Sequence, residues 1–356
     1  MVTLSNHTSF QDGVFSMYEN LKGRYRVTTL TMSNSDYPTS NDANNLFVEV
    51  PKRPGITKDT FNLVILHRMM KKVRSIKFDV VYFESFHVWN YPIMLYCKRE
   101  HIPMAHAIND VIPHEGDSMV KIKDLLNELT VYLSDRVILR SVDGLNNAIQ
   151  RFPKYKWKMQ KVDLWYSFPK YCAPRRGKVL FFGRMNKYKG IEILYELVLH
   201  TPDIQYVIAG KADESVKDTV DSLRVLPNVQ LNEGVIPYSQ MHDYFYDSTC
   251  TILPYETATQ SGVVLDAYKH SRPVVAFSVG ALVEQIEDGV TGFLAEPGNI
   301  TALECKLRKI VDMPNDQYEL MCRKSYRKGL DAYSAKSREK EFLDAIGVGQ
   351  LRESES

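Results

Sequence analysis

Two basic side chains lie five positions apart in a short segment that follows a buried-looking strand. Arg184 and Lys189 come after the apolar run 179–182, and Gly183 and Gly190 flank them. A tight turn at the carboxyl end of a strand can direct both cations to one point, where Arg offers paired hydrogen bonds and Lys a point charge. Such a pair suits a diphosphate, whose growing negative charge it would stabilise. The spacing alone leaves a surface turn with solvated cations equally open.

A second segment combines a small polar loop with the start of a predicted helix. An apolar strand should end at Leu253, and the helix should begin near Ser261–Gly262. Free N–H groups at a helix start bind phosphate, and glycine lets a ligand approach closely. Asp266 lies one turn further on the same side, where its carboxylate could accept hydrogen bonds from two ribose hydroxyls. The alternatives are a plain N-cap at Ser261 and a helix-dipole partner at Asp266.

The elements that must position these residues alternate between strand and helix along most of the chain. Strands are expected at 2–5, 25–31, 46–50, 79–83, 103–108, 136–139, 178–182, 205–209, 249–253 and 273–277. Helices are expected at 14–21, 58–75, 89–98, 119–133, 191–199, 239–246 and 262–270. Such alternation predicts parallel sheets covered by helices. Residues 151–178 are basic, aromatic and proline-containing, so we expect a linker there between two doubly wound α/β domains.

Composition excludes several functional classes. The chain has 356 residues and a formal net charge of +2, which is too small to indicate nucleic acid. Residues 1–170 hold an excess of basic side chains and the remainder an excess of acidic ones, which indicates either an anionic partner or a chance imbalance of solvated faces. Five scattered cysteines without a Cys-x-x-Cys pair argue against zinc and suit a reducing cytoplasm. The sequence shows no signal peptide and no run of about 18 apolar residues, so we expect a cytoplasmic protein.

The two chemical segments together resemble the family 4 glycosyltransferases, which are retaining enzymes with the GT-B fold. One mark is the Gly183-Arg…Lys-Gly190 turn, and a second is the segment 266–276, which reads Asp-Ala-Tyr-Lys-His-Ser-Arg-Pro-Val-Val-Ala. A third is the segment 280–294, which begins with Gly280 and contains Glu284-Gln-Ile-Glu-Asp-Gly. Residues 228–235 are similar to the family's strand before its nucleotide-contacting loop. The resemblance covers residues 178–310 densely and the first half thinly.

The resemblance implies two Rossmann-like domains that face a central cleft, with a C-terminal helix that crosses back to the first domain. Residues 1–170 would bind the acceptor, residues 171–330 would bind the nucleotide sugar, and residues 331–356 would form the returning helix and tail. The activity implied is transfer, with retention of anomeric configuration, from a UDP- or GDP-sugar to a glycan or lipid-linked acceptor in bacterial polysaccharide or cell-surface glycan synthesis.

The resemblance also assigns residues to the donor site. Arg184, Lys189 and backbone amides would stabilise the leaving diphosphate, so neither a covalent enzyme nucleophile nor a metal or other cofactor is expected. No Asp-x-Asp motif is placed like a metal clamp. The remaining donor contacts are expected at Gly183, Gly210, Gln260, Ser261, Gly262, Val263 and Asp266.

The chain departs from the family pattern around the second segment. The family commonly carries two glutamates eight residues apart, whereas here the first position is Ala258 and the second is Asp266. Asp266 is one methylene shorter than Glu, and contact with ribose is still plausible at that length.

The first half supplies few candidate residues. Residues 109–116 resemble the family's His-Asp-x-x-Pro-His segment, in which Asn109 replaces the first His and His114 is retained. We expect His114 to contact the donor sugar or the reacting centre, and Asp110 to orient His114 or cap a turn; a solvated His is the alternative. The segment 7–13 corresponds in place to the family's acceptor loop, and of the usual double glycine only Gly13 remains.

Three further interpretations stay open. The basic and apolar residues of 58–75, with the cations of 151–161, fit either an interfacial helix on the inner face of the cell membrane or an ordinary amphipathic core helix. A sugar-nucleotide epimerase on the same scaffold is one rival function. A non-catalytic nucleotide-sugar-binding subunit with a degenerate site is the other, because Ala258 and Asn109 replace expected residues.

Overall fold

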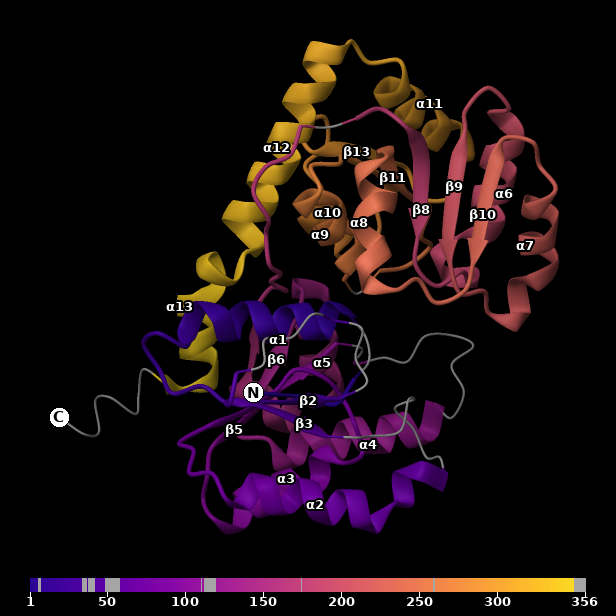
Figure 1. Ribbon diagram of the computed structural model, residues 1–356. Coiled ribbons are helices and arrows are strands. Elements are labelled where there is room, and N and C mark those ends of the chain that lie inside the picture. The colour runs from indigo at the N-terminus through magenta and orange to yellow at the C-terminus, as the bar shows by residue number, and fades with distance from the viewer. Residues whose placement is uncertain are drawn as a thin grey trace. The chain divides into compact units, whose positions relative to one another are not determined.

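The computed structural model describes residues 1–5, 8–33, 37, 42–48, 58–109, 111, 120–173, 175–258 and 260–348. The chain divides into two compact units, shown in Figure 1. The first unit consists of Met1–Ser167 together with Ser334–Ser356, and the second of Phe168–Tyr333.

The described part of the first unit contains a seven-stranded parallel sheet with the order β3-β2-β1-β4-β5-β6-β7. Its inner strands β2, β4 and β5 are buried along their whole length, as parallel strands between two helical layers must be. They are β1 (Val2–Thr3), β2 (Thr29–Met32), β3 (Asn45–Val48), β4 (Val81–Phe83), β5 (Met104–Ile108), β6 (Arg136–Leu139) and β7 (Met159–Lys161).

Helices cover both faces of this sheet (Figure 1). Helices α1 and α13 pack together on one face, over a core that includes Tyr82, Ala105 and Ile138. Helices α2 to α5 cover the other face, over cores that include Phe83 and Val137. The helices are α1 (Thr8–Leu21), α2 (Leu63–Arg74), α3 (Asn90–Arg99), α4 (Val120–Leu133), α5 (Val142–Arg151) and α13 (Ala335–Ile346), with 3₁₀ helices η1 (Lys58–Phe61) and η2 (Pro153–Lys158).

The second unit contains a six-stranded parallel sheet with the order β10-β9-β8-β11-β12-β13. Helices α6, α7 and α11 lie on one face, and α8, α9 and α12 lie on the other (Figure 1). The strands are β8 (Lys178–Phe182), β9 (Tyr206–Gly210), β10 (Val229–Glu233), β11 (Ser248–Leu253), β12 (Val274–Phe277) and β13 (Gly292–Ala295). The helices are η3 (Lys187–Lys189), α6 (Ile191–His200), η4 (Glu214–Val216), α7 (Lys217–Arg224), α8 (Tyr238–Tyr246), α9 (Gly262–Lys269), α10 (Leu282–Gln285), α11 (Ile300–Val311) and α12 (Asn315–Tyr333).

Both sheets are doubly wound, which confirms the predicted fold class. In each sheet the strand order reverses beside the first strand, between β1 and β4 and between β8 and β11. Ligands of such sheets bind beyond the carboxyl ends of the strands at this reversal. The C-terminal helix α13 packs on α1 of the first unit, as predicted. None of the helices formed by the described residues is long and apolar enough to cross a membrane.

Two predictions from the first half are wrong. The segment 8–13 is not a loop, because α1 begins at Thr8 and places Gly13 inside the helix. Its polar groups serve buried backbone instead of solvent: Gln11 Nε2 donates to Ser5 O at 3.0 Å, and Gly13 O accepts from Trp165 Nε1 at 2.7 Å. Gly13 therefore lies within α1, and its carbonyl holds the buried Trp165 indole.

The second prediction, a linker at 151–178, is wrong only in its extent, because the chain passes between the units inside this range. Residues 153–161 belong to the first unit, where they form η2 and the edge strand β7, which pairs with β6. The basic residues there mislead because Lys158 is buried, with its ammonium donating to Ser134 O at 2.7 Å. The units exchange at Ser167–Phe168.

A buried ion pair lies at the carboxyl ends of two strands of the first sheet. Glu84 follows β4 and Arg140 follows β6, and their side chains are each 1% exposed with an N–O distance of 2.6 Å. The Tyr82 hydroxyl bonds to both, and the Arg140 guanidinium lies 4.5 Å from the Trp165 ring centroid. Burial raises the pKa of Glu84, and the charge of Arg140 opposes that shift. Each charge is therefore tolerable only with its partner in place.

We predict that Arg140→Met lowers the free energy of unfolding by about 3–5 kcal/mol, because Glu84 is then buried without a counter-charge. The control is the double variant Glu84→Met/Arg140→Met, which removes both charges and should lose less. Urea unfolding followed by tryptophan fluorescence measures this unit alone, because all three tryptophans (Trp89, Trp157 and Trp165) lie in it. Equal losses in the single and double variants would contradict the unpaired-charge explanation.

Candidate functional site

The turn after β8 is built by two glycines and a cap. Gly183 ends the strand with a φ of 114°, and Gly190 opens α6 with a φ of 69°. Between them, Asn186 Oδ1 accepts a hydrogen bond from Lys189 N at 3.1 Å and so begins η3. A Cβ on Gly190 would lie 1.9 Å from the carbonyl oxygen of Pro254, the first residue after β11. The turn is therefore pressed against the loop that leaves the neighbouring strand.

Lys189 lies where the two loops meet. A Cβ on Gly183 would be 3.2 Å from Lys189 Nζ and 3.9 Å from Val263 Cγ2, so the ammonium is close to both the β8 turn and the first turn of α9. The same ammonium lies 5.1 Å from the ring centroid of Tyr255. Burial, and secondarily the charge of Arg184, lowers the pKa of Lys189 to about 8. An incoming anion would raise the pKa of Lys189 again and so stabilise its charged form.

Arg184 lies on the exposed side of the same turn. Its side chain is 49% exposed, and its Nε is 3.9 Å from Asp213 Oδ2 in the loop after β9. Asp213 is held in place because its N–H donates to Met185 O at 2.9 Å. Long side chains at this exposure can move, so the guanidinium is positioned to swing toward an anion near Lys189.

The start of α9 offers hydrogen-bond donors. The first turn of a helix leaves N–H groups without intrahelical acceptors. The Ser261 side chain does not cap them, which leaves the N–H groups of Gly262, Val263 and Val264 for a ligand. The helix dipole adds partial positive charge at the same point. The structure thus brings together four predicted site residues: Gly183, Lys189, Gly262 and Val263.

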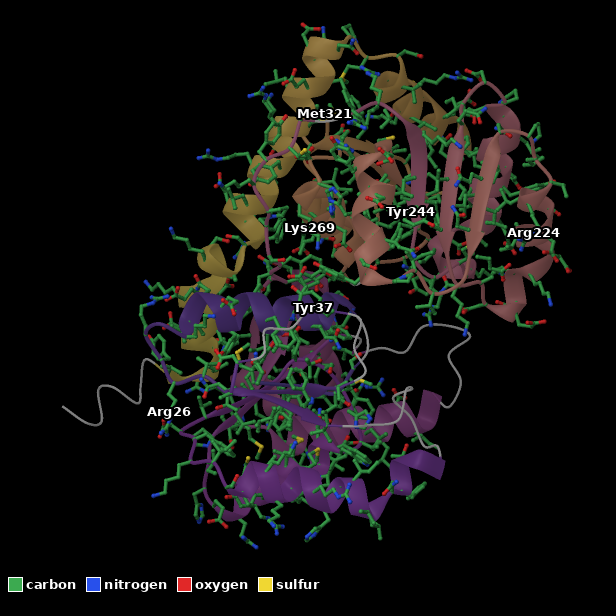
Figure 2. The ribbon with its side chains drawn as sticks, viewed as in Figure 1. Arg26, Tyr37, Arg224, Tyr244, Lys269 and Met321 are labelled. Carbon is green, nitrogen blue, oxygen red and sulfur yellow. The ribbon has the colours of Figure 1, made fainter. Side chains whose placement is uncertain are left out.

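Asp266 lies deeper than the sequence suggests. Asp266 is 7% exposed, and its Oδ1 is 3.3 Å from Lys269 Nζ. Lys269, which Figure 2 labels, is itself 6% exposed. The Lys269 ammonium in turn lies 5.4 Å from the ring centroid of Tyr238 at the start of α8. The carboxylate is therefore oriented by a buried ion pair toward α8.

The remaining predicted residues differ in their surroundings. Ala258 is buried, and its carbonyl accepts from Ala281 N at 2.9 Å. Gln260 is half-buried. Gly210 meets a packing requirement, because a Cβ there would lie 1.8 Å from Gly183 O. His114 and Asp110 lie outside the described residues.

Three residues near the site were missed by the sequence reasoning: Asp213, Tyr255 and Lys269. Each lies within three residues of the end of a strand or helix already assigned to the site. That proximity is the only signal that could have found them, because their contacts cross between elements. Among the described residues, no three His, Cys, Asp or Glu side chains gather as a metal-binding group.

Sequence comparison with known proteins agrees with this geometry. A family profile described as "Glycosyl transferases group 1" matches residues 176–313. A sulfoquinovosyl transferase of Arabidopsis thaliana is 27% identical over 142 residues, which are 39% of this chain and 27% of that protein. A D-inositol 3-phosphate glycosyltransferase of Mycobacterium sp. is 29% identical over 129 residues, which are 35% of this chain and 29% of that protein. The matched segment spans less than a third of the length of these two relatives.

Solved structures resemble the whole chain. The Anabaena protein HepE, in complex with UDP and glucose, has a TM-score of 0.73 at 14% identity, and the match covers 98% of each chain. Sucrose-phosphate synthase of Thermosynechococcus elongatus has a TM-score of 0.72 at 15% identity, with 99% of this chain and 97% of that chain covered. Identities this low establish the fold alone. Residues 176–313 thus match the model of the group 1 glycosyl transferases, and the chain as a whole has the GT-B fold of these solved structures.

Proposed function

We propose that the chain is a retaining glycosyltransferase that takes its sugar from a UDP- or GDP-sugar. The observation that carries the proposal is the meeting of Lys189, Gly183 and the first turn of α9 beyond the carboxyl ends of β8 and β11. An ammonium and uncapped helix N–H groups at one point form a site for the diphosphate of the donor. The family match over the same residues supports this assignment.

In the proposed reaction, the bond between the anomeric carbon and the diphosphate oxygen breaks. Negative charge then grows on the leaving diphosphate, and Lys189, Arg184 and the α9 amides stabilise it. The acceptor hydroxyl attacks the same face of the sugar through an ion-pair-like state and passes its proton to the leaving diphosphate oxygen, so the anomeric configuration is kept. We propose that neither a metal nor a covalent enzyme intermediate is needed, because the two cations and the helix start supply the positive charge.

The proposed base site is a hollow beyond the ends of β9 and β10. It is lined by Lys211, Asn232, Glu233, Gly234 and Val235, among others. It lies beside the β8 turn, because Met185 N donates to Lys211 O at 2.8 Å. A nucleotide whose diphosphate lies at Lys189 can therefore extend its base toward this hollow. Thermal-shift measurements with UDP-, GDP- and ADP-sugars would identify the base.

We propose that the first unit binds the acceptor, a glycan or lipid-linked sugar of bacterial polysaccharide or surface-glycan synthesis. Asn109 directly follows β5 and is half-buried at the ligand edge of the sheet. His114 and Asp110 remain predicted contacts in the adjoining segment. This part of the proposal depends on the resemblance of residues 109–116 to the family segment.

A non-catalytic nucleotide-sugar-binding subunit is the second candidate. Ala258 favours it, because a buried alanine with its carbonyl bound to Ala281 N stands where the family commonly has a glutamate. Release of nucleoside diphosphate in the presence of an acceptor distinguishes transfer from binding alone. An epimerase would interconvert sugar nucleotides without releasing the diphosphate.

We predict that Arg184→Ala and Lys189→Ala each lower kcat by about 10²-fold or more, the usual worth of a transition-state charge contact. The measurement is nucleoside diphosphate release under saturating donor. Lys187→Ala is the matched control, because Lys187 is an exposed lysine of the same turn. Unchanged turnover in both site variants would refute the assignment of the leaving-group site.

A second prediction concerns pH. Lys189 is protonated below its pKa of about 8 and loses its charge above it. We therefore expect kcat/KM for the donor to fall about tenfold per pH unit above that value, because the neutral amine no longer attracts the diphosphate. Lys189→Arg should remove the descending limb. Circular dichroism at each pH controls for unfolding, and a flat wild-type profile well above pH 8 would contradict this role of Lys189.

We propose a cytoplasmic protein that lies peripherally on the membrane through the first unit. Of the two interpretations of residues 58–75, the structure supports the core helix, because α2 buries Met69, Met70 and Val73. Exposed apolar residues lie in η1 and at the start of α2, at Phe61, Leu63 and Val64, and others form a stripe along α4: Ile122, Leu125, Leu129 and Tyr132.

The end of α4 adjoins η2, because Lys158 Nζ donates to Tyr132 O at 3.3 Å. Trp157 of η2 is 76% exposed, and the neighbouring Lys154 and Lys156 are exposed as well. Apolar and aromatic side chains beside lysines suit the interface of an anionic bilayer.

We predict that the wild-type protein floats with vesicles containing phosphatidylglycerol at low salt, and that Leu125→Glu/Trp157→Glu lowers the bound fraction several-fold. Val225→Glu is the matched control, because Val225 is 79% exposed in the second unit. No wild-type flotation at low salt, or equal flotation of all variants, would rule out this membrane surface.

A further inference from the structure

Gln285, the last residue of α10, holds the backbone of Ser261 at both its N–H and its carbonyl. Its Oε1 accepts from Ser261 N at 3.1 Å, and its Nε2 donates to Ser261 O at 3.1 Å. The two residues are 3% and 4% exposed. Both polar ends of one side-chain amide are therefore used on one residue of the β11–α9 loop, 24 positions earlier in the chain.

The clamp belongs to a rigid support. The Gln285 carbonyl accepts from the buried Tyr268 hydroxyl at 3.1 Å. One turn earlier, Ala281 N donates to Ala258 O at 2.9 Å, and a Cβ on Gly280 would lie 2.0 Å from the same oxygen. The segment 280–285 thus holds the loop at two points, Ala258 and Ser261, immediately before α9 begins.

The position of the clamp decides which amides remain for a ligand. Ser261 is the N-cap of α9, and its own N–H already donates a hydrogen bond to Gln285 Oε1. The next three N–H groups, of Gly262, Val263 and Val264, are the ones that the helix leaves without acceptors. The Ser261 carbonyl and the Gly262 N–H belong to one peptide plane, so holding this carbonyl fixes the direction of the first of the three donors, and with it the start of α9, before any ligand arrives. Fixed donors bind and stabilise charge better than donors that must reorganise.

A neutral amide is the side chain that this position requires. A carboxylate could accept from Ser261 N but could not donate to Ser261 O, and it would place negative charge behind an anion site. A hydrocarbon side chain would leave both the N–H and the carbonyl of Ser261 buried without partners.

We propose that Gln285 is a positioning residue of the diphosphate site, which acts by fixing the two peptide groups that flank the Ser261 Cα and so aiming the first turn of α9 at the β8 turn. This inference rests on the proposed donor site. Gln285 touches the loop and not the ligand, so it should govern the affinity for the diphosphate group and leave recognition of the nucleoside unaltered.

The test is binding of inorganic pyrophosphate, which reports on the diphosphate site independently of base, sugar and turnover. We expect Gln285→Met to weaken pyrophosphate binding in calorimetry by about tenfold or more, since small displacements of aligned groups are costly. Gln285→Glu should weaken it at least as much. The matched control is Gln160→Met, which removes a comparable side-chain contact, Gln160 Nε2 to Ala345 O at 2.8 Å, in the first unit.

A second readout separates positioning from general destabilisation. With uridine and UDP, or guanosine and GDP if the wild-type protein binds those, Gln285→Met should weaken the diphosphate and leave the nucleoside unchanged. Unchanged pyrophosphate affinity in Gln285→Met, even with a lower melting temperature, would overturn the inference while leaving the donor site intact. Equal weakening of nucleoside and diphosphate would also overturn it. Failure of the wild-type protein to bind pyrophosphate and every nucleoside diphosphate would instead refute the proposed donor site itself.

Discussion

The tight contact between Gly190 and Pro254 is the constraint on which the candidate donor site depends. The strands β8 and β11 are parallel neighbours, so the loops that follow them begin at the same edge of the sheet. Adjacency alone, however, does not fix the distance between these two loops. Gly190 can approach the Pro254 carbonyl because it has no side chain and takes a left-handed backbone conformation. The hydrogen bond from Glu256 N to Tyr188 O, at 2.9 Å, joins the loops a second time. Lys189, which lies between these two contacts, is thereby held beside α9.

The two units use the carboxyl ends of their strands in opposite ways. In the first unit, Glu84 and Arg140 form a buried ion pair against the ring of Trp165, so their charges are neutralised inside the protein. In the second unit, Arg184 stays half-exposed, and Lys189 is desolvated enough to lower its pKa. The same architecture therefore buries a neutral ion pair after two strands of one sheet and leaves two cations after a strand of the other.

The sequence predicted the features that lie within one short segment and missed the contacts that form between separate elements. The strand, glycine, cations and second glycine around Arg184 and Lys189 follow each other within a dozen residues, so their geometry could be anticipated from turn chemistry. The doubly wound order then placed that turn beside the loop after β11. The clamp of Gln285 on Ser261 and the ion pair of Lys269 with Asp266 could not be anticipated, because periodicity shows which face of an element is buried but not which polar groups meet there. Gly13 shows the opposite error: a polar stretch resembled a loop although its side chains serve buried backbone.

The return of α13 to the first unit affects the order in which the chain can fold during synthesis. Phe342, Ala345 and Ile346 belong to the core on one face of the first sheet, beside Tyr82 and Trp165. That core cannot close until the ribosome has released residues made after the whole second unit. The second unit is continuous in sequence, so it can fold as soon as it emerges. The half of the protein that is made first is thus completed last. Until then, the part of the sheet face that α13 covers beside α1 stays exposed, a surface for chaperones to protect.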